Sequence, residues 1–162
     1  MRWLRHLFAP SARNTFPEAS LQRIGAAVAE GEARHGGQVC FAVESSLAPA
    51  ALWARLDAQA RAHQVFAQLR VWDTQANNGV LVYLLLADRR IEIVADRGLD
   101  GRVSAEHWRG VCQLMEERLR AGDAEDAATA GIAAVSDLLA RHFPRAPGQA
   151  EANELPDLPR ML

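Results

Sequence analysis

Short apolar runs alternate with amphipathic segments along the chain. The runs at residues 38–44 and 80–87 are rich in β-branched and large apolar side chains, which predicts buried strands. A third run, at residues 91–96, follows the second after a short polar turn, and this arrangement predicts an antiparallel hairpin. Because the strands are apolar on both sides, we expect helices to cover both faces of the sheet.

The amphipathic segments have apolar residues at helical spacing. Ser45 and Ser46 precede Pro49 at the start of one segment, and Ser104 is the expected N-cap of a later one. Gly122 and Pro144 mark the ends of the last two segments. The predicted helices are residues 17–34, 49–68, 104–122 and 124–142.

The order of these elements predicts an α/β fold, a three-layer α/β/α sandwich. Its mixed sheet combines a right-handed parallel βαβ unit with the antiparallel hairpin. The expected organisation is an N-terminal arm at residues 1–16, one domain at residues 17–144 and a tail at residues 145–162. The tail is proline-rich and has no apolar period, so we expect it to be disordered or loosely docked.

The candidate chemistry lies at one end of the hairpin. A hairpin brings the start of its first strand beside the end of its second, and here both ends carry amides, acids and glycines. Carboxylate, amide and carbonyl oxygens suit calcium or magnesium, and glycine lets a backbone approach a ligand closely. The predicted ligand-binding residues are Asn77, Asn78, Gly79, Arg97 and Gly98, and the predicted metal ligands are Asp73, Asp96 and Asp100.

The same residues also have a purely structural interpretation. Asn-Gly is a common turn pair because both residues tolerate positive φ. The stretch Asp-Arg-Gly-Leu-Asp-Gly at residues 96–101 could equally be a loop with an Asx turn and a surface ion pair. The acids do not follow the alternating spacing of an EF-hand loop.

At the other end of the sheet, the parallel strands place Glu44 near Asp88, with Arg89 and Arg90 in the turn. Charged residues are common where strands end, so a solvated rim is favoured over a second site. The tryptophans do not indicate a further binding site. Packing in the core or at its rim is expected for Trp53, Trp72 and Trp108, and Trp3 could anchor the N-terminal arm.

Composition narrows the function further. The chain has 162 residues, 49% of them hydrophobic, and a net charge of −2 with interspersed signs, which fits one globular domain and argues against nucleic-acid binding. All 18 basic residues are arginine, so a lysine nucleophile or Schiff base is excluded. Cys40 and Cys112 are expected to be buried free thiols. The N-terminal stretch predicts neither a secretion signal nor a membrane span, so the cytoplasm is the expected compartment.

The stretch NNGVLVYLLLADRRIEIVADRGLDGRV, followed by AGIAAVSDLL, resembles the TPM-domain family. That family includes a thylakoid-lumen phosphatase-like photosystem II repair factor and many bacterial proteins, and this chain resembles its short soluble proteobacterial branch. The resemblance covers residues 36–143 and implies an α/β/α sandwich. Many relatives carry a signal peptide or membrane anchor, and Arg97 stands where relatives have a small or aromatic residue.

The resemblance also implies divalent metal binding and, in some members, weak acid phosphatase activity, whereas others are non-catalytic accessory proteins. We therefore expect a soluble non-catalytic module that binds calcium or magnesium, a protein partner, or both, without an organic cofactor. The alternative is a weak metal-assisted acid phosphatase in which Asp96 or Asp73 holds the cation and Arg97 holds the phosphoryl oxygens. A third interpretation is docking to a membrane-associated complex, with the tail residues Leu155, Leu158, Met161 and Leu162 as anchors.

Overall fold

The computed structural model describes residues 1–149 and 153–162. Within this part of the chain, one mixed sheet has the strand order β3-β2-β1-β4. β1 is parallel to β2 and to β4, and β2 and β3 form the antiparallel hairpin. The strands are β1 (Gln38–Glu44), β2 (Gly79–Leu85), β3 (Arg90–Ala95) and β4 (Arg160–Met161).

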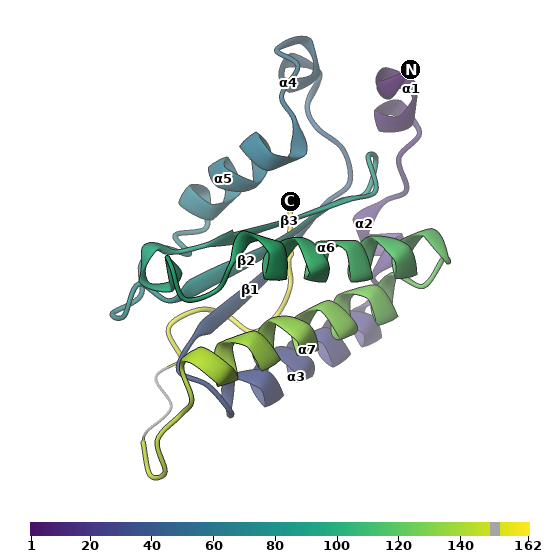
Figure 1. The fold of residues 1–162 in the computed structure, drawn as a ribbon. Helices are drawn as coiled ribbons and strands as arrows, with labels where there is room; N and C mark the ends of the chain where they lie inside the picture. Colours follow the sequence, from purple (N-terminus) through teal and green to yellow (C-terminus); the bar gives the residue numbers. More distant parts are fainter. Residues whose placement is uncertain (150–152) are drawn as a thin grey trace.

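Helices cover both faces of the sheet, as Figure 1 shows, so the predicted three-layer α/β/α fold is confirmed. Alternate residues of β1 face opposite layers: Phe41 packs in one apolar cluster and Ala42 in the other. One face carries α3 (Glu18–Glu32), α6 (Ala105–Arg120) and α7 (Ala124–His142), and the other carries α4 (Pro49–Trp53) and α5 (Ala58–Gln68).

The two central strands are buried at every position, because helices cover both faces of the sheet. Ser104 caps α6 as predicted, since its side chain accepts a hydrogen bond from the His107 amide. Asp123 caps α7 in the same way.

The prediction of a single helix at residues 49–68 is wrong, because this segment forms two helices, α4 and α5. Arg55 adopts a φ of 55°, which no α-helix allows. Asp57 then caps α5 by accepting a hydrogen bond from the Ala60 amide at 2.7 Å. The predicted serine start is also wrong: the residue before α4 is Ala48, and the Ser45 hydroxyl instead accepts a hydrogen bond from the Ala12 amide.

The described part of the C-terminal tail, predicted to be disordered or loosely docked, packs against the sheet. Leu155 is buried in the same apolar cluster as α5. Gln38 Oε1 accepts hydrogen bonds from the amides of Glu154 and Leu155, at 2.9 and 3.1 Å. β4 then pairs with β1, so tail residues close the edge that β1 would otherwise expose.

The N-terminal arm forms α1 (Arg2–Leu7) and α2 (Ala12–Thr15). α2 belongs to the core, because Ala12 and Phe16 are buried and the Phe16 ring meets Phe41 edge-on at 6.1 Å. α1 instead stands at the end of the molecule that also carries α4 (Figure 1). In the described residues, no helix combines the length and the apolar character that crossing a bilayer requires.

Candidate functional site

The hairpin places the amide pair beside the distal loop. Val80 pairs with Ala95, and beyond this pair the Asp96 amide donates to the Gly79 carbonyl at 2.9 Å. One step further, the Gly98 amide donates to the Asn77 carbonyl at 2.8 Å. The two segments are therefore joined backbone to backbone at this end of the sheet.

Two glycines permit this close approach. A Cβ atom on Gly98 would lie 2.3 Å from the Asn77 carbonyl oxygen and 2.6 Å from that of Ala76. A Cβ atom on Gly79 would lie 2.1 Å from the Val71 carbonyl oxygen. Because the obstructing atoms belong to the backbone, only glycine fits at either position without moving the chain.

Asn78 and Asp96 each present one buried oxygen without a hydrogen-bond partner among the described residues. The Asn78 side-chain amide donates to the Gly36 carbonyl at 2.5 Å, which fixes the side chain and leaves Oδ1 unpartnered. Asp96 Oδ1 accepts from the Arg97 amide at 2.8 Å and caps the short 3-10 helix Arg97–Leu99, which leaves Oδ2 unpartnered. Leaving a buried acceptor unpaired costs about 1–3 kcal/mol, so these two oxygens need an explanation.

The other predicted site residues lie further out. Asp73 is exposed and its carboxylate forms an ion pair with Arg70 at 2.6 Å. Asp100 and Arg97 are both exposed. Within the described chain, no three His, Cys, Asp or Glu side chains gather closely enough to hold a metal. The three predicted aspartates therefore do not form one acidic cluster, and their individual roles as ligands stay predictions.

The opposite end of the sheet holds a polar network that the sequence did not predict. Glu44 is buried rather than part of a solvated rim, so that prediction is wrong. Its carboxylate accepts two hydrogen bonds from the Arg61 guanidinium, at 2.9 and 3.0 Å. It also accepts one from the Tyr83 hydroxyl at 2.6 Å. Burial, reinforced by Glu44, raises the pKa of Tyr83 well above its ordinary value.

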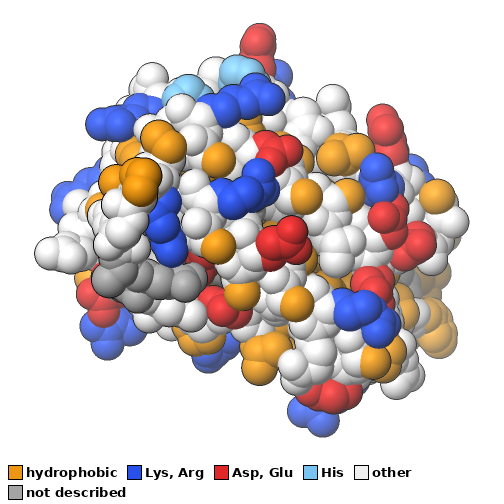
Figure 2. Space-filling view, turned by 90° about the horizontal axis from the view of Figure 1, so that it is seen from below, with side chains coloured by type: hydrophobic (Ala, Val, Ile, Leu, Met, Phe, Trp, Pro, Cys, Tyr) orange, Lys and Arg blue, Asp and Glu red, His pale blue; other side chains and the backbone are white. Residues whose placement is uncertain are grey.

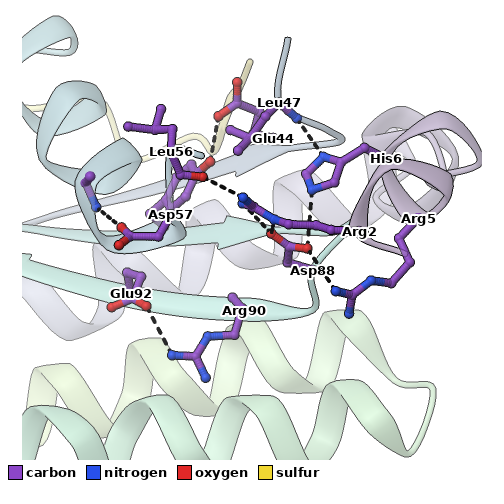
Figure 3. Close-up of polar contacts among 12 residues, drawn as sticks. Arg2, Arg5, His6, Glu44, Leu47, Leu56, Asp57, Asp88, Arg90 and Glu92 are labelled. Atoms are coloured by element: carbon purple, nitrogen blue, oxygen red, sulfur yellow. Dashed lines mark hydrogen bonds and ion pairs between the residues drawn. The ribbon is translucent and has the colours of Figure 1, made fainter. Parts of the chain in front are cut away.

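Asp88 forms a second network with the N-terminal helix, as Figure 3 shows. Arg2 donates to its carboxylate at 2.9 Å and also to the Leu56 carbonyl at 2.7 Å. His6 lies 3.2 Å from the same carboxylate, and its other ring nitrogen accepts from the Leu47 amide. Burial alone would raise the pKa of Asp88, but Arg2 and His6 hold it below its ordinary value.

A cavity of about 480 Å³ lies beside these networks. Its charged groups are largely neutralised by one another: Arg2 pairs with Asp88, and Arg90 pairs with Glu92 at 3.3 Å (Figure 3). Mutual pairing leaves little uncompensated charge to attract an ionic ligand, so this cavity is a weaker candidate site than the hairpin end.

Replacing Tyr83 with phenylalanine is expected to lower the free energy of unfolding by about 1.5–3 kcal/mol, because Glu44 loses a buried hydrogen bond to its charged carboxylate. Urea unfolding followed by tryptophan fluorescence measures this change. A double-mutant cycle with Glu44→Gln should show that the two effects are coupled, and independent effects would contradict the described network.

Comparison with known proteins identifies the family. The TPM domain model matches residues 11–138, which is most of the chain. The chain belongs to the TPM domain family. The match begins inside the expected N-terminal arm, consistent with the packing of α2 into the core of the TPM domain.

Two solved structures share the fold of this TPM domain. The NMR structure of the BA42 protein from the psychrophilic bacterium Bizionia argentinensis has a TM-score of 0.76 at 24% identity, covering 88% of this chain and 92% of that one. The N-terminal domain of a protein from P. gingivalis has a TM-score of 0.63 at 18% identity, covering 84% and 85% of the two chains. None of the curated proteins matches the chain.

Proposed function

We propose that this TPM-domain protein is a non-catalytic accessory module that binds a divalent cation, calcium in preference to magnesium, at the end of the β2–β3 hairpin. The observation that carries the proposal is the pair of buried, unpartnered oxygens, Asn78 Oδ1 and Asp96 Oδ2. Both belong to segments that backbone hydrogen bonds hold together.

The proposal requires both side chains to reach one cation, which would then satisfy both oxygens. Carboxylate and amide oxygens are ligands of calcium, which accepts irregular geometry and completes its shell with carbonyl oxygens and water. Magnesium demands near-octahedral geometry and releases its water reluctantly, so it fits an irregular loop pair less well. Asp96 would supply the negative charge, and Asn78 a neutral oxygen.

The proposed site has only one carboxylate, which favours cation binding over metal-assisted hydrolysis. A metal centre that activates water is usually held by several charged or imidazole ligands, and no three such side chains cluster within the described residues. With one carboxylate, affinity should be low, with a dissociation constant on the order of 10⁻³ M. A site this weak responds to cation concentration rather than holding a permanent ion.

Calcium titration followed by amide NMR tests the proposal. Saturable shifts are expected at Asn78, Asp96 and Gly98, with smaller or no shifts for magnesium. In Asp96→Asn these shifts should disappear, although asparagine can still cap the following 3-10 helix. The absence of saturable shifts at Asn78 and Asp96 at millimolar calcium would reject the cation site.

Asp73→Asn is the matched control, since Asp73 is an exposed acid on the same side of the molecule and is paired with Arg70. This variant should keep the calcium response. Equal loss of binding in both variants would mean either that Asp73 is itself a ligand, as the sequence predicts, or that diffuse negative charge attracts calcium; both results contradict a site built on Asn78 and Asp96 alone.

Metal-assisted phosphatase activity is the second candidate. It is supported by the exposed Arg97, which follows Asp96 directly and could hold phosphoryl oxygens. Phosphate-ester hydrolysis that requires calcium or magnesium and disappears in both Asp96→Asn and Arg97→Gln would favour this candidate over a non-catalytic module. The cytoplasmic location and a protein partner stay predictions.

A further inference from the structure

An exposed apolar surface marks the end of the molecule formed by α1 and α4. The side chains of Leu7, Phe8 and Trp53 are 73–78% exposed, which is unusual for large apolar residues. The rings of Trp3 and Trp53 meet edge-on at 5.5 Å and join the two helices. The prediction that Trp53 packs in or beside the core is therefore wrong. We call this surface the α1–α4 patch: Trp3, Leu4, Leu7, Phe8 and Trp53.

The polar side of α1 anchors the helix and turns its apolar side outward. Arg2 and His6 reach into the molecule to Asp88, as Figure 3 shows, and His6 also accepts from the Leu47 amide. The outward side chains are consequently held in place on a fixed helix. No loop has to order before they contact a partner, which lowers the entropic cost of binding.

The surroundings of the patch are basic, although the whole chain has a net charge of −2. Residues 1–16 contain three arginines and no acidic residue, and Arg55 is the sole charged residue at positions 45–56. Arg55 and Arg89 are exposed and have no ion pair within the described residues. By contrast, Figure 2 shows the side of α3 and α7, where acidic and basic groups are mixed and apolar groups are scattered.

A hollow of about 550 Å³ beside the patch has an apolar and a basic part. Leu4 and Phe8 line it together with Arg5, Arg89 and Asp88. The Asp88 carboxylate is already paired with Arg2 and lies 3.7 Å from Arg5, so Arg89 is the arginine in the lining without an ion pair among the described residues. A phospholipid presents a phosphate next to an acyl chain, so one molecule complements both parts. An anionic protein surface would match the arginines but leave the large apolar side chains unsatisfied.

We propose that the α1–α4 patch binds the surface of a membrane that contains anionic phospholipid. Tryptophan, phenylalanine and leucine side chains enter the boundary between headgroups and acyl chains, and the arginines contact lipid phosphates. α1 and α4, with six and five residues, are too short to span the bilayer, so the proposed contact is with the membrane surface. This inference does not depend on the cation site.

Vesicle sedimentation tests the inference. The full chain is mixed, with EDTA present, with vesicles of phosphatidylcholine alone or of phosphatidylcholine with phosphatidylglycerol. We expect binding to the anionic vesicles, with a blue shift of tryptophan fluorescence, and weakening by salt. Leu7→Ser/Phe8→Ser should bind at least about tenfold more weakly, because the two large apolar side chains that enter the boundary are lost.

Trp72→Ser is the matched control, because Trp72 is also an exposed large residue but follows α5 near the other end of the sheet. This variant should bind as the wild type does, and all variants should keep the wild-type far-UV circular dichroism. Failure of the wild type to bind anionic vesicles would overturn the inference, as would unchanged binding by the double variant. A concentration-dependent dimer that the double variant abolishes, without vesicle binding, would assign the patch to a second copy instead.

Discussion

Replacing Gly98 with alanine is expected to lower the free energy of unfolding by about 3 kcal/mol, one of the largest effects of any single methyl group in this protein. The added Cβ would lie 2.3 Å from the Asn77 carbonyl oxygen and 2.6 Å from that of Ala76. Both obstacles are backbone atoms, so a side-chain rotation cannot relieve the clash. The loop must move, and the hydrogen bond from the Gly98 amide to Asn77 would weaken. Urea unfolding at neutral pH measures the loss.

Gly110→Ala is the matched control. Gly110 lies within α6, and a Cβ atom there would meet nothing within 4 Å. Alanine has the higher helix propensity, so this variant should gain roughly 0.5–1 kcal/mol. If Gly98→Ala proved as stable as the wild type, the described approach of the two segments at the hairpin end would be incorrect.

Acidification from pH 6.5 to pH 4 is expected to cost about 3 kcal/mol of stability through His35 alone. Burial, followed by the charge of Arg34, lowers the pKa of His35 from 6.5 to about 4. The unfolded chain therefore takes up a proton below pH 6.5, whereas the folded protein does so only near pH 4. The contribution is fully present above pH 6.5 and is lost as the pH falls through this window.

The surroundings of His35 explain why its ring stays neutral. The side chain is fully buried, and Nδ1 accepts a hydrogen bond from the Gly37 amide at 3.1 Å. A protonated ring could not accept that bond, and its charge would lack solvent.

A His35→Gln variant separates this effect from the titration of the carboxylates. Its unfolding free energy should fall less steeply than that of the wild type between pH 6.5 and pH 4, whatever its stability at neutral pH. Urea unfolding at both ends of the window gives the two slopes, and equal slopes would contradict the assignment to His35.

The hairpin and the surrounding helices could be predicted because their signals are local. β2 and β3 are apolar runs separated by a short polar turn, and such a pattern permits few arrangements. The placement of Asn78 beside the segment after β3 followed from chain reversal alone. The orientation of the Asn78 side chain depends on its hydrogen bond to the Gly36 carbonyl. Gly36 precedes β1, so this contact could not be inferred from the hairpin alone.

The predictions that failed depended on distant or weak signals. Arg55 breaks the helical stretch and Asp57 caps the next helix, but a single aspartate in an amphipathic run resembles an ordinary exposed residue. β4 has only Arg160 and Met161, too few residues for any period, and it forms because β1 has a free edge. Strand propensity is a local property of the sequence, so it does not predict pairing with a sheet edge that exists only in the folded protein.

The burial of Glu44 was missed for a related reason. A glutamate at the end of a strand is ordinarily solvated, and its partners Arg61 and Tyr83 come from α5 and β2. From the sequence, nothing distinguishes Arg61 from the other arginine of the predicted helix at residues 49–68. The exposure of Trp53 could not be predicted from the sequence either, since an aromatic residue in a helix is more often buried than exposed to solvent.

The most direct measurement for the cation site is a crystal structure of the protein grown with calcium and phosphate. We predict a calcium ion that contacts both Asn78 Oδ1 and Asp96 Oδ2, at the 2.3–2.6 Å typical of calcium–oxygen bonds. Phosphate bound to that ion and to Arg97 would favour the phosphatase candidate. If water or protein groups satisfy both oxygens in the presence of saturating calcium, and no ion lies between them, the proposed cation site is contradicted.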